Sequence, residues 1–401
     1  MKHCSFFLAT VLMLTLNLDA GEFAAGRETA LLWEGTVNKQ IKVYLPSNYR
    51  EDTKWPLIVY YHGTNGFPDT SLMQAYTGQK DFIIVSMDYF IKGQMNFNTP
   101  EELSKHVLKE FDNITKVLTS LKGKVSFDPG KVILSGVSKG GWLTSYISEQ
   151  KLDFFAGAAI FIGGYLQRDR KVLIPRTPAK PVYIGDGEYD ANFYPSYACL
   201  EFYKKLKANP VFEYYDGIGH KLPNKIPARF SEWLNLFRPG YDLKIDEWYQ
   251  KSIAAFKNDK TLKSYRELRE SPYLYLLSIE QRKAFNPILK QKLEEDKNFE
   301  KELRAYNAFF SIIKLQSTAS FPKDWENVIL RYKKLFNDYD GTEYAKRAVH
   351  HYEAAQNNLK NSIEFYKKAE QQQKKLSEDN KTPPKGIDVN SGRNRINPRM
   401  K

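Results

Sequence analysis

The chain has 401 residues, enough for one large domain or two ordinary ones, and its 42% apolar content supports a buried core. The formal net charge is +13, but the basic residues are spread along the chain. The densest stretch is residues 374–401, with eight Lys or Arg against three Asp or Glu. We interpret the charge as solvated surface, which argues against a nucleic-acid partner; a dedicated anionic partner is the less favoured alternative.

The beginning of the chain has the order of a secretory signal peptide. A short basic start precedes an apolar run over residues 4–16, and small residues follow at Ala20 and Ala25. The run is short for a membrane span, although a retained anchor is the alternative. We expect a signal peptide over residues 1–20 with cleavage after Ala20 or Ala25. The protein would then be secreted or periplasmic, with no stable membrane span after cleavage.

Strand-like and helix-like patterns alternate between residues 28 and 240. Leu103, Val107, Phe111 and Ile114 recur at steps of four and three, which indicates one face of a helix. Continuously apolar strands separated by helices predict an α/β domain over residues 28–240, with a mostly parallel sheet covered on both faces. The runs expected to be strands are residues 41–45, 57–61, 82–85, 132–134, 158–162, 182–184 and 211–215.

The residue composition changes after Gly240, where apolar strand runs end and Lys, Glu, Gln and Tyr dominate. A helical stripe of apolar residues starts at Ala345 and ends at Tyr366. We therefore expect an all-α region over residues 241–376 and a disordered basic tail over residues 377–401. The helical region could cover an active-site mouth, mediate dimerisation or bind a partner protein.

Residues 136–140 match the pattern G-x-S-x-G, with Ser138 at its centre. An apolar strand run leads into the motif, and a helical stretch opens at Gly141. A sharp strand-to-helix turn forces the serine into a strained conformation, and side chains in place of the flanking glycines would collide with the neighbouring elements. We expect Ser138 to be a catalytic nucleophile; an ordinary turn is the alternative.

A serine nucleophile requires an adjacent base that is held by a third group. Among the six histidines, only His220 follows a late strand, in a Gly-rich loop, and it is the expected base. His106 is expected to be exposed on its helix. The loop 185–190 offers three carboxylates, of which Asp190 is the expected orienting acid and Asp186 the fallback. Glu188 is the least favoured of the three.

Residues 41–238 resemble the single-domain serine esterases of the α/β-hydrolase superfamily. This group includes feruloyl and acetyl-xylan esterases, polyhydroxybutyrate depolymerases and dienelactone-hydrolase-like proteins. The chain order Ser138, Asp190, His220 is that of the superfamily. The resemblance covers about half of the chain and is specific for fold and catalytic type, but not for substrate. It runs through residues 44–46, 56–63, 128–132, 136–140, the loop of Asp190 and residues 219–220.

The resemblance also implies an oxyanion hole, in which each N–H donor contributes on the order of 3 kcal/mol. The amide of Lys139, directly after the nucleophile, is one expected donor. The other is assigned to Thr64, because residues 62–66 resemble the oxyanion turn of the family. His62 would fix this turn by hydrogen bonds, and no metal or organic cofactor is expected. The Lys139 side chain is interpreted as a surface lysine, with attraction of an anionic substrate as the alternative.

The substrate is the open question. Only residues 164–180 stand where many relatives insert a lid, which favours an open site and bulky or polymer-linked esters. The nearby aromatic residues would form either a stacking wall or part of the core. The leading hypothesis is an exported serine esterase that acts through an acyl-enzyme. The alternatives are a serine peptidase of the same fold and a non-catalytic module whose helical extension binds a partner. The four aromatic residues are Trp142, Tyr189, Phe193 and Tyr194.

Overall fold

The structure, a computed structural model, describes residues 23–379 apart from residues 94, 96, 98, 165–178 and 260. The predicted signal peptide and nearly all of the predicted tail lie outside the described residues, as does most of the segment 164–180. None of the described helices is long and apolar enough to cross a membrane.

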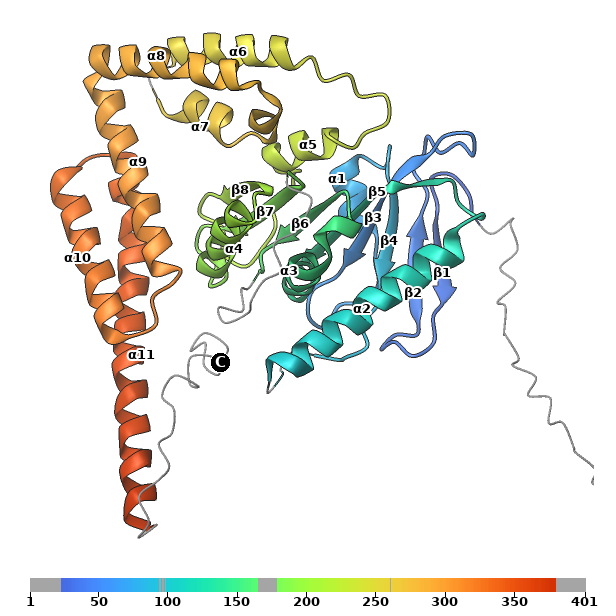
Figure 1. Cartoon of the computed structure of the whole chain (residues 1–401), viewed down its shortest axis with the longest axis horizontal. Coiled ribbons are helices and arrows are strands. Elements are labelled where there is room, and N and C mark those ends of the chain that lie inside the picture. Colours follow the sequence, from blue (N-terminus) through green and yellow to red (C-terminus); the bar gives the residue numbers. More distant parts are fainter. Residues whose placement is uncertain are drawn as a thin grey trace, which may run out of the picture.

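A twisted eight-stranded sheet lies at the centre of the first half of the described chain (Figure 1). Its strand order is β1-β2-β4-β3-β5-β6-β7-β8. The six strands from β4 to β8 along this order are parallel, while β2 runs antiparallel to both of its neighbours. The strands are β1 (Glu28–Leu32), β2 (Gln40–Tyr44), β3 (Trp55–Tyr61), β4 (Ile83–Met87), β5 (Phe127–Val137), β6 (Gly157–Phe161), β7 (Pro181–Gly187) and β8 (Asn209–Tyr215).

Helices cover both faces of the sheet. On one face, α2 (Pro100–Leu121) and α3 (Lys139–Lys151) pack against β3 side chains such as Leu57. On the other face, α1 (Ser71–Thr77) and α5 (Ala228–Asn235) pack against β3 side chains that include Ile58. Successive side chains of a strand point to opposite faces, so two covered faces require continuously apolar strands. The predicted α/β fold is confirmed.

Strand β1 is the element that the sequence did not predict. It pairs with β2 at the edge of the sheet, and Leu31 is its only buried side chain. A strand that buries one side chain carries no apolar run, so no hydrophobic pattern marks it.

The described part of residues 241–376 contains helices and no strand, which confirms the predicted C-terminal all-α region. Phe309 and Tyr344 of this region share one buried cluster with Phe193 and Tyr214 of the sheet domain. Helix α9 packs against α4 (Phe193–Lys205), so the core continues from the sheet into the helices (Figure 1). The helices are α6 (Ile245–Asn258), α7 (Lys263–Arg269), α8 (Ile279–Glu295), α9 (Lys297–Gln316), α10 (Pro322–Asp338) and α11 (Glu343–Asp379).

Candidate active site

Ser138 occupies the turn between β5 and α3, with φ 54° and ψ −114°. A residue other than glycine in such a region costs of order 1–3 kcal/mol, and the cost is typical of functional sites. The flanking glycines are required because a Cβ on Gly136 would collide with the Gly140 backbone, and a Cβ on Gly140 with the Tyr61 carbonyl. The close approach of β3, β5 and α3 therefore produces the strained turn that the sequence predicted.

His220 lies within hydrogen-bond distance of both other residues that were predicted to act with it. The Ser138 Oγ atom lies 3.0 Å from Nε2 of His220, and Nδ1 of His220 lies 2.6 Å from Oδ2 of Asp190. With a proton on Nδ1 donated to the carboxylate, Nε2 is free to accept the serine proton. All three follow parallel strands, so the sheet brings them to one edge.

Exposure differs sharply along this row of groups. The Asp190 side chain is 2% exposed, whereas that of His220 is 49% exposed. The second Asp190 oxygen, Oδ1, accepts the Asn192 amide at 2.9 Å, which fixes the carboxylate. The Asp190 carboxylate is therefore shielded and held, while the His220 imidazole stands at the surface.

Asp186, the fallback acid, has a different partner. It is fully buried, and its Oδ2 atom accepts a hydrogen bond from the Ser196 hydroxyl. Burial, and secondly the neighbouring charge of Asp190, hold the pKa of Asp186 well above its usual range. The hydrogen bond of His220 goes to Asp190, and Asp186 is a buried neighbour of that carboxylate.

The loop predicted to hold an oxyanion donor passes directly beside Ser138. A Cβ on Gly63 would lie 3.6 Å from the Ser138 Cβ, and Thr64 follows in the chain. The buried His62 ring fixes the loop, because its Nδ1 atom lies 2.7 Å from the Gly63 carbonyl oxygen. Lys139 is the first residue of α3, where backbone amides have no partner within the helix. The two amides as donors remain a prediction.

The Lys139 side chain is buried, so its interpretation as a surface lysine was wrong. Its Nζ atom donates to the Ile91 carbonyl at 2.7 Å and lies 3.7 Å from the centroid of the Tyr89 ring. Burial lowers the pKa of the Lys139 ammonium to about 8, with Glu110 as the largest opposing charge. The Lys139 side chain therefore ties the turn of Ser138 to the segment after β4.

His106 is also buried, contrary to expectation. Its ring packs against Phe97, with the ring centroids 5.1 Å apart, and the Phe90 amide donates to the neighbouring Glu110. Burial, followed by the charge of Lys139, lowers the pKa of His106 to about 4. The segment after β4 folds over this side of α2, which the helical periodicity alone could not show.

Two of the four aromatic residues near the site pack in the core. Phe193 and Tyr194 are 1% and 6% exposed, so of the two alternatives from the sequence, core packing holds for them and the stacking wall does not. Tyr189 is 43% exposed, and Trp142 is partly buried against the cluster of α2 and α3. Within the described chain, no group of three His, Cys, Asp or Glu side chains is placed to hold a metal ion.

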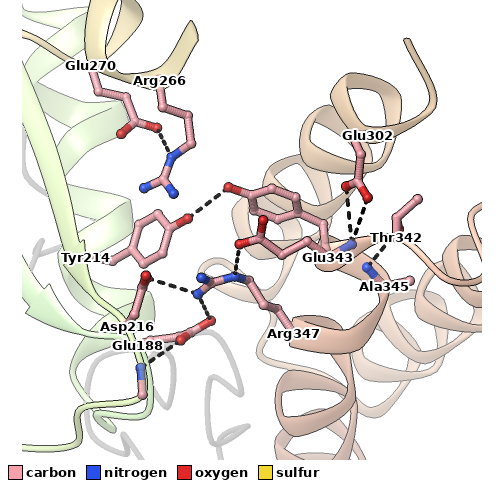
Figure 2. A network of polar contacts seen from close by, with 12 residues as sticks. Glu188, Tyr214, Asp216, Arg266, Glu270, Glu302, Thr342, Glu343, Ala345 and Arg347 are labelled. Atoms are coloured by element: carbon pink, nitrogen blue, oxygen red, sulfur yellow. Dashed lines mark hydrogen bonds and ion pairs between the residues drawn. The ribbon is translucent and has the colours of Figure 1, made fainter. Parts of the chain in front are cut away.

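Arg347 of α11 reaches the loops after β7 and β8, and it was not predicted from the sequence. Its guanidinium contacts Glu188 and Asp216, and Figure 2 shows all three side chains pointing toward one another. Arg347 lies next to the apolar stripe of α11, where the sequence pattern predicts that a charged residue faces solvent. No motif links it to residues more than a hundred positions earlier.

Comparison with known proteins gives one family match. A family model described as "Dienelactone hydrolase family" matches residues 48–260, a segment that contains Ser138, Asp190 and His220. No curated protein matches the chain. Several solved structures show a distant likeness, at a level that leaves the substrate open.

Three of these structures illustrate the level of likeness. A ferulic acid esterase from Anaeromyces mucronatus in complex with ferulic acid is 17% identical over 49% of this chain and 84% of its own, with a TM-score of 0.39. A phospholipase/carboxylesterase from Dyadobacter fermentans is 16% identical over 46% and 90%, with a TM-score of 0.37. A mutant feruloyl esterase module from Clostridium thermocellum, complexed with sinapinate, is 19% identical over 49% and 82%, with a TM-score of 0.36.

Proposed function

The chain belongs to the dienelactone hydrolase family, and from that premise we propose that it is a serine hydrolase that cleaves carboxylic esters through an acyl-enzyme. The family membership agrees with the resemblance predicted from the sequence. The observation that carries the proposal is the unbroken row of contacts from the strained Ser138 through His220 to the buried Asp190. Such a row supplies a nucleophile, a base and an orienting acid.

In the proposed first half-reaction, Ser138 Oγ bonds to the ester carbonyl carbon as His220 Nε2 takes the hydroxyl proton. The carbonyl oxygen becomes an oxyanion next to the amides of Lys139 and Thr64. Asp190 keeps the Nδ1 proton in place and stabilises the imidazolium. The bond to the alcohol oxygen then breaks, His220 returns the proton to the leaving alcohol, and an acyl group stays on Ser138.

In the second half-reaction, His220 takes a proton from water as the water oxygen bonds to the acyl carbon. The bond to Ser138 Oγ breaks, and His220 returns the proton to that oxygen. The carboxylic acid leaves, and the free serine is restored. The half-exposed imidazole of His220 supports bulky or polymer-linked esters as substrates. The signal-like pattern over residues 1–20 supports export.

A panel of chromogenic acetyl, butyryl and feruloyl esters, each paired with the matching anilide, tests this proposal. We expect turnover of at least one ester at more than about 100 times the rate of its anilide, because an alcohol is the better leaving group. The measurement is the initial rate of chromophore release by the folded protein, with Ser138→Ala as control. Anilide turnover without ester turnover would favour a peptidase, and ester turnover that survives Ser138→Ala would refute the proposal.

The pH dependence follows from the protonation state of His220, which must be neutral to act as a base. The hydrogen bond to Asp190, aided by the carboxylate charge and opposed by burial, raises the pKa of His220 above its ordinary value. Below that pKa, kcat/KM is expected to fall about tenfold per pH unit as the base becomes protonated. A pH–rate profile whose acid limb is flat down to pH 5 would contradict His220 as the base.

A further inference from the structure

Two loops carry the acid and the base of the proposed triad. The acid loop, residues 188–190, follows β7 and ends in Asp190, and the base loop, residues 216–220, follows β8 and ends in His220. Backbone hydrogen bonds join the start of the acid loop to the end of β8 and to the base loop, so the two loops lie against each other. These bonds run from the Glu188 amide to the Tyr215 carbonyl (3.1 Å) and from the Tyr189 amide to the Ile218 carbonyl (2.9 Å).

Arg347 of α11 binds both loops at once (Figure 2). Its Nη1 atom lies 3.0 Å from Oε1 of Glu188 in the acid loop and 2.9 Å from Oδ1 of Asp216 in the base loop. The other Glu188 oxygen, Oε2, accepts the Gly217 amide at 3.0 Å. One cation from the helical region thus closes a ring of contacts around the two loops.

Neighbouring contacts hold Arg347 in this position. Its Nε atom donates to Glu343, one turn earlier in α11, at 2.9 Å. The hydroxyls of Tyr214, at the end of β8, and Tyr344, in α11, lie 2.9 Å apart in a buried contact. Figure 2 shows Tyr214 and Arg347 side by side between the sheet and α11. The register of α11 against β8 is therefore fixed, and with it the reach of the guanidinium.

The negative charges in this ring make the position of the two loops depend on the Arg347 cation. The Glu188 side chain is 3% exposed, while that of Asp216 is 60% exposed. Without Arg347, a buried carboxylate would lose its ion-pair partner, and two like charges would face each other across the joined loops. Both effects would displace the acid loop. The 2.6 Å contact between Asp190 and His220 depends on the position of this loop, because Asp190 is its last residue.

From these contacts we propose that α11 completes the active site from outside the sheet, with Arg347 as a positioning residue that sets the geometry between Asp190 and His220. Arg347 contacts no reacting atom and acts only through the acid and base loops. The proposal rests on the proposed function, because it concerns the same triad. It gives residues 241–376 a role in catalysis that a separate partner-binding module would not have.

The kinetic test compares Arg347→Gln and Arg347→Lys with Arg304→Gln. The Gln variant removes the positive charge. The Lys variant keeps the charge but lacks the planar guanidinium, whose N–H groups can donate to several acceptors at once. We expect Arg347→Gln to lower kcat about 10- to 100-fold with KM changed less than about threefold, and Arg347→Lys to lose less. Arg304 forms an exposed ion pair with Glu300 in α9, and its variant should keep the wild-type kcat. Rates are expressed per site titrated with a phosphonate, so partial unfolding does not count as lost activity.

A second readout needs no substrate. The proton on His220 Nδ1, shared with Asp190 across 2.6 Å, should give a low-field proton resonance in the wild type that is absent in Asp190→Asn. We expect Arg347→Gln to shift this resonance upfield or to broaden it. An unchanged resonance and unchanged kcat in both Arg347 variants would overturn the inference. A wild type that shows the resonance but hydrolyses no ester would instead contradict the proposed function alone.

A variant of the exposed partner covers the case in which Arg347→Gln does not fold. Asp216→Ala removes the contact to the base loop at a side chain that is 60% exposed, so the fold should tolerate it. We expect this variant to lower kcat about 3- to 10-fold, less than Arg347→Gln because the Glu188 contact remains. A wild-type kcat in Asp216→Ala would then count against the proposal.

Discussion

Replacing Ser138 by alanine is expected to lower kcat/KM for ester hydrolysis by about 10⁴- to 10⁶-fold, with the residual rate coming from binding and the oxyanion donors. The variant loses the atom that lies 3.0 Å from the base, and no other hydroxyl takes its place in the described contacts of His220. The fold should be kept, because alanine is smaller than serine and the flanking glycines are unchanged. The measurement is kcat/KM together with a thermal melt of both proteins.

Ser120→Ala is the matched control for this prediction. Ser120 lies in α2, where its hydroxyl donates only to the Val117 carbonyl of the same helix. It should keep the wild-type rate. A loss of less than about tenfold in Ser138→Ala would mean that another group is the nucleophile, because a catalytic serine contributes far more than that.

Asp190→Asn is expected to lower kcat by about 10⁴-fold, because an amide beside Nδ1 favours the wrong tautomer of His220. In that tautomer Nε2 carries the proton and cannot accept one from Ser138. Asp186→Asn provides the comparison at a similarly buried carboxyl. The pKa of Asp186 is held well above its usual range by burial, which favours the neutral form, and an amide can replace its hydrogen bond with Ser196, so the expected loss is less than about tenfold.

The outcome of this pair decides between the two acids that the sequence left open. Rates are measured at the pH optimum of each variant, with circular dichroism to verify the fold. If Asp186→Asn lowered kcat more than Asp190→Asn, the assignment of Asp190 as the orienting acid would be wrong. The 2.6 Å contact between Asp190 and His220 would then not be the one that orients the base.

The sheet and the turn of Ser138 could be predicted because their causes are local in sequence. Strands covered on both faces must be continuously apolar, and the strained turn needs glycines on both sides of the serine. Strand β1 escaped prediction because an edge strand that buries only Leu31 leaves no such pattern. The order of Ser138, Asp190 and His220 along the chain followed from the strands that precede them.

The environments of Lys139 and His106 could not be predicted because the segment between β4 and α2 covers them. Periodicity describes which side of a helix is polar, but not whether another loop lies over that side. Here Phe90 and Phe97, in the segment after β4, fold onto α2, and the cation of Lys139 finds a buried carbonyl acceptor. Two polar side chains that were predicted to be exposed are therefore buried in the structure.

The contacts of α11 are the least predictable part of the site. Arg347 meets Asp216 and Glu188 across sequence separations of 131 and 159 residues. Contacts of this range depend on how α9 packs against α4 and how α11 packs against α9 and meets β8, which no short motif records. The helical region was predicted as such, but its contact with the acid and base loops emerged only from the three-dimensional arrangement.

The proposed mechanism requires Ser138 to be an activated nucleophile, and covalent trapping tests this most directly. The folded protein is treated with a fluorophosphonate and then digested, and the masses of its peptides are measured by mass spectrometry. We predict one phosphonyl adduct, located on Ser138, that forms much more slowly in His220→Ala because the base is gone. A folded protein whose Ser138 stays unmodified, or one that carries the adduct on another residue, would contradict the account.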